Sequence, residues 1–166
     1  RCAGPRSAAR VTLMVHYLIV ALLGLSIFEG IRFFPLHPIA VPAVPREVAL
    51  VLMWVTGIPT AASVLNLAVR GLGAPFAVAL SHRLATDLMY RYTRNPMVLG
   101  TILFLFSTGL FFGSLSFLIW VGGGLAPVWI YFVKTYEERE LELRFGDAYL
   151  AYRSRTPFLI PGIPRD

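Results

Sequence analysis

The chain has 166 residues, of which 57% are hydrophobic and 14% are charged, and its formal net charge is +6. With a mean hydropathy of +0.68, it has too little polar surface to cover a soluble domain of this length, so the composition predicts an integral membrane protein. Its single cysteine, Cys2, excludes a disulfide framework and a multi-thiolate zinc site, and we expect no bound metal.

Four apolar segments predict an all-α membrane protein with about four transmembrane helices, at residues 11–28, 48–69, 97–112 and 117–133. The last two belong to one stretch, Asn95 to Val133, that carries no charged residue. A straight helix of that length would measure about 58 Å, roughly twice the ~30 Å hydrocarbon core of a bilayer. We therefore expect a helical hairpin that turns at Gly113-Ser114-Leu115-Ser116 and brings its two polar ends to the same side of the membrane.

Small residues and prolines predict local irregularity in two of these helices. Gly57 and Pro59 favour a kink in the second span, and Gly122-Gly123-Gly124 with Pro127 favours a loosened or kinked fourth span. For the glycine run, close helix packing is the favoured interpretation over a cofactor contact.

The basic residues predict an orientation. Of the fifteen Lys and Arg residues, only Arg32 and Arg46 fall between the first and second spans, and the other thirteen lie on the opposite side. The positive-inside rule then makes both termini and the loop between the second and third spans cytoplasmic. Because the basic residues are spread along juxtamembrane segments, the positive charge suits anionic headgroups, and we expect no nucleic-acid partner.

Beyond the fourth span, residues 135–152 predict a cytoplasmic amphipathic tail helix that Gly146 interrupts, with Glu140 and Arg144 as a surface pair. Pro157, Pro161 and Pro164 exclude helix after it. No repeat or second domain is visible, so residues 1–166 form one membrane domain.

Two polar motifs flank the predicted hairpin. The first is Tyr90-Arg91-Tyr92-Thr93-Arg94-Asn95-Pro96-Met97-Val98-Leu99-Gly100, and the second combines Glu137-Glu138, Leu141, Phe145-Gly146, Tyr149 and Tyr152, followed by Arg155-Thr156-Pro157 and Ile160-Pro161. This pattern resembles the isoprenylcysteine carboxyl methyltransferase family and its phospholipid methyltransferase relatives, which are integral membrane enzymes. The resemblance covers about residues 71–161. The chain departs from the usual pattern at Leu88-Met89, where the family usually has Gly-Pro, and at Val98, where it usually has tyrosine.

The resemblance implies S-adenosylmethionine as the cofactor, with S-adenosylhomocysteine as the product, in a site formed by the cytoplasmic ends of the third and fourth spans and covered by the tail. It implies Arg94, Arg155 and Glu138 as catalytic residues. The cofactor-binding residues that it implies are Tyr92, Arg94, Asn95, Pro96, Met97, Gly100, Glu137, Glu138, Leu141 and Tyr149. Elementary chemistry agrees, since a guanidinium suits the cofactor's carboxylate and glutamates suit its ribose hydroxyls or its ammonium.

Simpler interpretations stand beside these roles. Arg94 could reach to headgroups, and Asn95 could cap the third helix. Glu137 and Glu138 point about 100° apart on a helix, so one would bind the cofactor while the other supports it, and the sequence leaves open which. Tyr149 and Tyr152 share a face that suits either interfacial anchoring or pocket lining, and Arg155 could contact a headgroup.

Three classes of function follow. The favoured one is methyl transfer from S-adenosylmethionine to a lipid-like or prenylated acceptor within the membrane, with O-methylation of a carboxylate preferred and N-methylation of a phospholipid amine as the alternative. A carboxylate acceptor needs no general base, and no histidine lies near Arg94 or Glu137 in the sequence. The others are an NADPH-dependent sterol-type reductase and a non-catalytic membrane protein that binds a partner.

Overall fold

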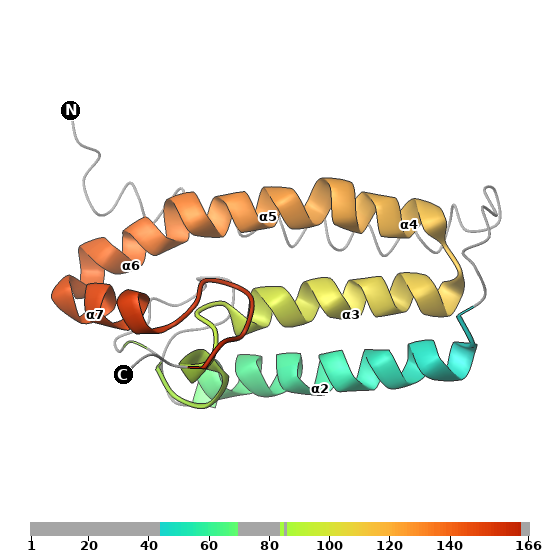
Figure 1. Cartoon of the computed structure of the whole chain (residues 1–166), viewed down its shortest axis with the longest axis horizontal. Helices are drawn as coiled ribbons and strands as arrows, with labels where there is room; N and C mark the ends of the chain where they lie inside the picture. The colour runs from blue at the N-terminus through green and yellow to red at the C-terminus, as the bar shows by residue number, and fades with distance from the viewer. Residues whose placement is uncertain (1–43, 70–83, 85, 164–166) are drawn as a thin grey trace.

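The structure, a computed structural model, describes residues 44–69, 84 and 86–163. The predicted first span, residues 11–28, and the N-terminal side of the membrane topology lie outside the described residues. Throughout the described part the regular elements are helices. In Figure 1 helix α2 (Arg46–Val69), helix α3 (Pro96–Phe112) and the long helix Leu115–Phe145 lie side by side, with the short helix α7 (Asp147–Arg155) folded back at one end.

The second predicted span is helix α2, Arg46–Val69, which begins two residues before the predicted start. The helix continues through Pro59 without a break. Hydroxyl groups bond to carbonyls one turn earlier, with Thr60 Oγ1 donating to Thr56 O at 2.7 Å and Ser63 Oγ donating to Pro59 O at 2.9 Å. Such internal bonds satisfy polar side chains inside an apolar helix. The kink expected at Gly57 and Pro59 stays a prediction.

The predicted hairpin is confirmed. Helix α3, Pro96–Phe112, begins with Pro96 in its first turn, where the missing N–H has no helical partner to lose. It ends at Gly113, whose φ of 68° is the left-handed conformation that glycine adopts without steric cost. Ser114 then caps the next helix by accepting a hydrogen bond from Phe117 N–H at 3.2 Å.

The chain returns as one 31-residue helix, Leu115–Phe145, made of α4 (Leu115–Ile119), η3 (Trp120–Leu125), α5 (Ala126–Phe132), η4 (Val133–Glu137) and α6 (Glu138–Phe145). Segment η3 is π-helical and contains the glycine run, so the predicted loosening of the fourth span is confirmed there. A second π-helical segment, η4, follows α5.

The tail predicted at residues 135–152 is helical, but its first part is the end of the fourth span, which continues without interruption into α6. Residues 134–138 contain neither glycine nor proline, so nothing stops the helix where it leaves the apolar region. The predicted interruption at Gly146 is confirmed: this residue has a φ of 53°, and helix α7, Asp147–Arg155, starts directly after it. The Glu140–Arg144 surface pair is also confirmed at 3.6 Å.

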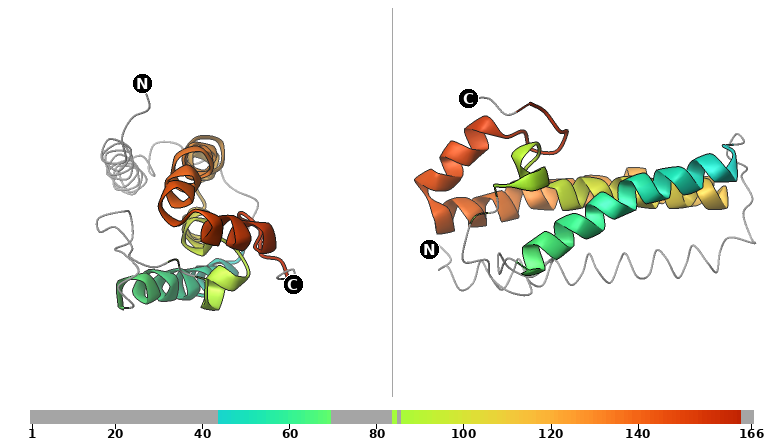
Figure 2. Two further views of the ribbon diagram at one scale, coloured as in Figure 1. Left: turned by 90° about the vertical axis from the view of Figure 1, so that its left-hand side faces the viewer. Right: turned by 90° about the horizontal axis from the view of Figure 1, so that it is seen from below.

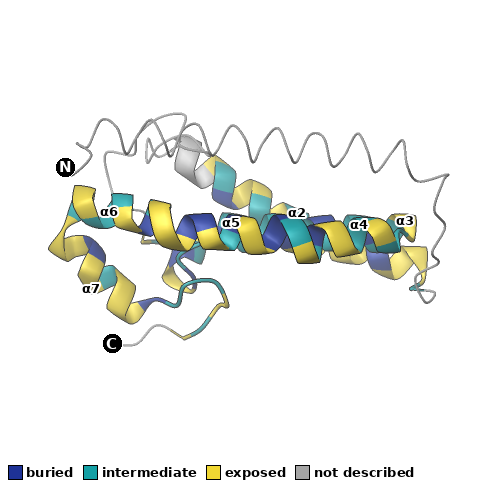
Figure 3. Ribbon diagram, turned by 90° about the horizontal axis from the view of Figure 1, so that it is seen from above, coloured by how far each residue is buried: buried dark blue, intermediate teal, exposed yellow. Residues whose placement is uncertain are grey.

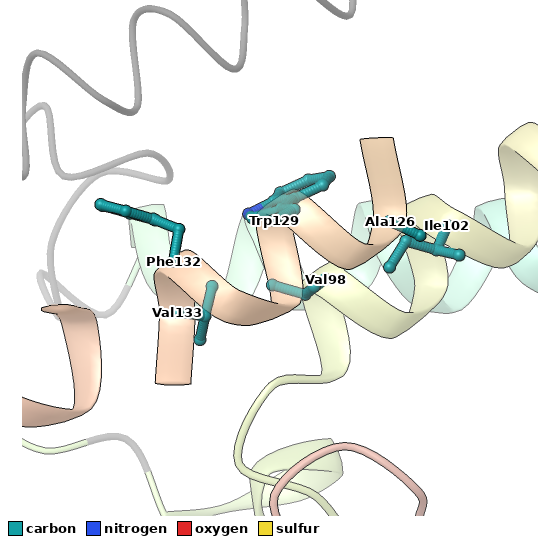
Figure 4. Close-up of a cluster of buried hydrophobic side chains, with 6 residues drawn as sticks. All are labelled: Val98, Ile102, Ala126, Trp129, Phe132 and Val133. Atoms are coloured by element: carbon teal, nitrogen blue, oxygen red, sulfur yellow. The ribbon is translucent and has the colours of Figure 1, made fainter. Parts of the chain in front are cut away.

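The core lies between α3 and the long helix. Its main cluster comprises Val98, Ile102, Ala126, Trp129, Phe132 and Val133, shown in Figure 4. Helices α2 and α3 approach closely at Gly100, where an added Cβ would lie 2.0 Å from Thr60 Oγ1. Small residues permit such an approach between helices in membranes.

The outer faces are apolar and exposed (Figure 3). Trp54, Ile58, Ile119 and Tyr131 are each at least 60% exposed. Two described helices, Arg46–Leu65 and Leu115–Phe145, are long and apolar enough to cross a membrane, and Pro96–Phe112 is a shorter apolar helix. Exposed apolar faces of this extent suit contact with lipid.

Candidate functional site

The site is built around the segment that enters α3. A short 3₁₀ turn, η2 (Leu88–Arg91), buries Tyr90 and leads through Tyr92 and Thr93 to Arg94. Leu88 has a φ of 52°, a left-handed conformation that is rare for a leucine. This is the position at which the resembling family usually has glycine, so the backbone keeps a turn that glycine would adopt more easily.

Arg94 and Glu138 meet at the open end of the hairpin, where the segment that follows η2 leads into α3. Arg94 Nη1 lies 2.6 Å from Glu138 Oε1, and the two side chains are only 10% and 7% exposed. Because these residues are 44 positions apart and flank the uncharged stretch, their contact confirms that both polar ends of the hairpin reach the same side.

This ion pair leaves hydrogen-bonding capacity unused. Arg94 Nε and Nη1 and Glu138 Oε1 are buried, and none of the three makes a hydrogen bond of ordinary geometry within the described chain. Nη1 and Oε1 are paired with each other at 2.6 Å, whereas Nε has no acceptor among the described residues. Buried polar atoms of this kind are uncommon unless a ligand or water completes them.

Tyr149, which is 1% exposed, adjoins the pair from α7. Burial raises the pKa of its hydroxyl; the Glu138 carboxylate raises it further, and Arg94 opposes that rise. Tyr152 Oη donates to Tyr90 O at 2.6 Å and so ties α7 to η2, and burial raises the pKa of this hydroxyl too. These contacts favour pocket lining over interfacial anchoring for Tyr149.

A C-terminal strap, residues 156–162, crosses the segment that precedes α3 (Figure 2). The Arg94 N–H donates to Pro157 O at 2.9 Å, and the Gly162 N–H donates to Tyr92 O at 3.0 Å. The ring of Phe158 lies beneath the Arg94 guanidinium, 5.7 Å from its carbon to the ring centroid. The strap thus covers one side of Arg94.

The other predicted residues fall into two groups. Pro96 is buried, and Met97, Glu137 and Leu141 are half-buried on the elements that carry the pair. In the second group, Gly100 faces Thr60 of α2, the side chain of Tyr92 is 51% exposed, and Arg155 is exposed at the end of α7.

Asn95 occupies the N-cap position of α3 but makes no side-chain capping bond, because its Nδ2 donates instead to Phe158 O at 2.9 Å. Sequence reasoning missed Thr93 and Phe158, which hold the strap in place. Thr93 lies inside the recognised motif, but no residue pattern indicates which backbone carbonyls its hydroxyl reaches.

Comparison with known proteins identifies a family for this chain. The profile described as "Phospholipid methyltransferase" matches residues 46–148, well over half of the chain. A protein-S-isoprenylcysteine O-methyltransferase of Schizosaccharomyces pombe is 35% identical over 86 residues, which cover 50% of this chain and 35% of that protein. A methanethiol S-methyltransferase 2 of Bradyrhizobium diazoefficiens is 34% identical over 77 residues, covering 46% of this chain and 28% of that protein.

The aligned part is thus about a third of the length of these curated relatives. The part that the family profile matches, residues 46–148, includes the hairpin with the Arg94–Glu138 pair. Methyltransferases of this kind use S-adenosylmethionine. The chain belongs to the phospholipid methyltransferase family and is an integral membrane protein of that family.

Proposed function

We propose that the chain binds S-adenosylmethionine beside the Arg94–Glu138 pair and transfers its methyl group to a lipophilic acceptor that enters from the bilayer. The observation that carries this proposal is the buried pair itself, in which Arg94 Nε has no acceptor among the described residues. Burying two charges is costly, so a buried pair whose donors are incompletely used is better suited to binding than to stability.

The residues fit the cofactor's chemistry. The Arg94 guanidinium has five N–H donors, of which Glu138 engages only part, so it can also bind a carboxylate. Glu138 and the neighbouring Glu137 offer carboxylate oxygens for an ammonium or for ribose hydroxyls. When bound, the cofactor supplies an electrophilic methyl group on a sulfonium.

The remaining residues divide by position. We assign Met97, Leu141 and Tyr149 to the walls of the cofactor site, because they flank the pair on α3, α6 and α7. Gly100 instead serves the contact with α2, since Thr60 fills the space beside it. Asn95 acts through the strap, and Tyr92 contributes its backbone carbonyl.

For the acceptor we favour a carboxylate on a lipophilic molecule. A carboxylate is already deprotonated and needs no proton acceptor, and the residues around Arg94 in the described part of the chain include no histidine. One relative is named an isoprenylcysteine O-methyltransferase and the other a methanethiol S-methyltransferase, and the family name adds phospholipids. Amine and thiol acceptors are therefore the alternatives for the acceptor experiment below.

The topology that we propose has four spans, with the termini and the site on the cytoplasmic side. Its support is the distribution of Lys and Arg together with the described hairpin, whose polar ends lie at the same end of the helices (Figure 1).

Cofactor binding can be tested on the purified chain in detergent by its thermal unfolding midpoint. S-adenosylhomocysteine should raise the midpoint in the wild-type chain, and NADPH should not. Glu138→Gln should lose most of this stabilisation, whereas the matched variant Glu142→Gln, one turn further along α6 in an exposed pair, should keep it. Equal stabilisation of both variants would remove Glu138 from the site, and stabilisation by NADPH alone would favour the reductase.

Turnover and acceptor identity need a second assay. Lipid extracts should be screened for methyl groups incorporated from labelled cofactor, and base-labile label would indicate a carboxyl ester. With an acceptor in hand, Arg155→Ala should lower kcat more than cofactor affinity, because this residue is exposed at the end of α7, whereas the Arg94–Glu138 pair is buried. An equal loss of both would assign Arg155 to binding.

A further inference from the structure

The C-terminal strap cannot satisfy its own backbone. It contains Pro157 and Pro161, which have no N–H to donate and which exclude helical hydrogen bonding. Its carbonyl oxygens therefore need donors from elsewhere, because a buried carbonyl without a partner is costly.

Three successive strap carbonyls find donors on three successive residues of the segment that enters α3. The Arg94 N–H donates to Pro157 O at 2.9 Å, Asn95 Nδ2 donates to Phe158 O at 2.9 Å, and Thr93 Oγ1 donates to Leu159 O at 2.9 Å. Thr93 Oγ1 also lies 3.3 Å from Phe158 O and accepts the Asn95 N–H at 3.3 Å. Thr93 is 3% exposed, so it lies at the centre of this buried network.

The strap also carries the side chains that touch Arg94 and the core. Phe158 and Leu159 pack against the main core cluster, and the Phe158 ring faces the Arg94 guanidinium at 5.7 Å. The attraction between a cation and an aromatic face restricts both the position and the orientation of the cationic group. The position of the strap therefore limits where Arg94 can point.

We infer that Thr93 is a positioning residue: its buried hydroxyl seats the C-terminal strap, and the seated strap directs the Arg94 guanidinium towards Glu138. The consequence for cofactor affinity depends on the proposed function, whereas the seating of the strap does not.

The test uses the full chain in detergent and three variants. Thr93→Val removes the hydroxyl at nearly constant volume, and Thr93→Ser restores it. Thr108→Val is the matched control, because the bond that its hydroxyl makes among the described residues lies within its own helix, to Phe104 O at 2.8 Å. Two quantities are measured: hydrogen exchange of the strap amides, Gly162 above all, and affinity for S-adenosylhomocysteine.

In Thr93→Val we expect roughly ten-fold faster exchange in the strap and roughly ten-fold weaker affinity, equivalent to about 1.4 kcal/mol for a lost buried hydrogen bond. Thr93→Ser and Thr108→Val should both match the wild-type chain. Rescue by serine identifies the hydroxyl as the group responsible.

Unchanged strap exchange in Thr93→Val would overturn the seating role. Faster exchange with unchanged affinity would overturn the positioning of Arg94 while leaving the proposed function intact. A wild-type chain that binds no S-adenosylhomocysteine would overturn the proposed function instead, and the exchange comparison would still decide whether Thr93 seats the strap.

Discussion

Removing one member of the buried Arg94–Glu138 pair should cost more than removing both. Arg94→Met leaves the Glu138 carboxylate buried without a partner, and Glu138→Leu does the same to the guanidinium. The double variant replaces two charges with two apolar side chains and leaves no buried charge behind. We therefore expect strongly non-additive effects on the free energy of unfolding.

The magnitude follows from the distance and the burial. At 2.6 Å the Coulomb attraction is about 6 kcal/mol for an effective dielectric constant of about 20, and desolvation of both groups offsets much of it. Breaking a buried pair costs about 3–5 kcal/mol, so we take about 3 kcal/mol for each single variant. The double variant should lose less than either single one, which gives a coupling energy of at least about 3 kcal/mol.

Thermal unfolding in detergent measures this coupling. For a chain of this size, about 3 kcal/mol lowers the midpoint by roughly 6–12 °C. The control cycle is Arg153→Ala with Glu142→Ala, a pair 3.6 Å apart whose side chains are 46% and 45% exposed, and its coupling should stay below about 1 kcal/mol. Additive losses at Arg94 and Glu138 would show that the folded chain does not form the pair.

Three further outcomes are expected from thermal unfolding. Gly100→Ala should destabilise the α2–α3 contact by about 1–3 kcal/mol, because its Cβ would meet Thr60. Gly123→Ala meets no atom within 4 Å and should be neutral to slightly stabilising, because alanine favours a helix over glycine; equal losses in both variants would contradict this contact. Leu88→Gly should stabilise the chain by about 0.5–1 kcal/mol net by relieving the left-handed backbone, and a loss of stability would mean that the leucine side chain contributes more than the strain costs. Burial raises the pKa of Tyr152, so the stability from its bond to the Tyr90 carbonyl is complete below about pH 10 and is lost as the pH rises beyond that. The unfolding midpoint of the wild-type chain should therefore fall more steeply above about pH 10 than the midpoint of Tyr152→Phe, and parallel curves would refute the reasoning.

The hairpin and its polar ends could be predicted because they follow from charge and length alone. An uncharged stretch too long for one crossing must turn, and Gly113-Ser114 is its natural turning point. Once the chain turns there, Arg94 and Glu138 return to one end of the hairpin, as the contact between them confirms. Residue types at fixed spacing were sufficient for this step.

The details of the site depend on contacts that residue types do not determine. The choice between Glu137 and Glu138 as partner of Arg94 depends on the register of the long helix, and the π-helical segment η4 changes that register just before Glu138. The side-chain amide of Asn95 donates to the carbonyl of Phe158, which lies 63 positions away in the proline-containing strap. Neither fact leaves a periodic trace in the sequence.

The buried pair is a poor way to gain stability, and this bears on why the chain has it. Apolar side chains of similar volume would hold the segment before α3 against α6 as well or better, because they avoid the desolvation of two charges. The Arg94→Met, Glu138→Leu double variant therefore separates two explanations. If the pair serves cofactor binding, this variant should unfold near the wild-type midpoint and show no stabilisation by S-adenosylhomocysteine. If it retains that stabilisation, the pair is a structural contact, and the unused donors of Arg94 have no ligand to explain them.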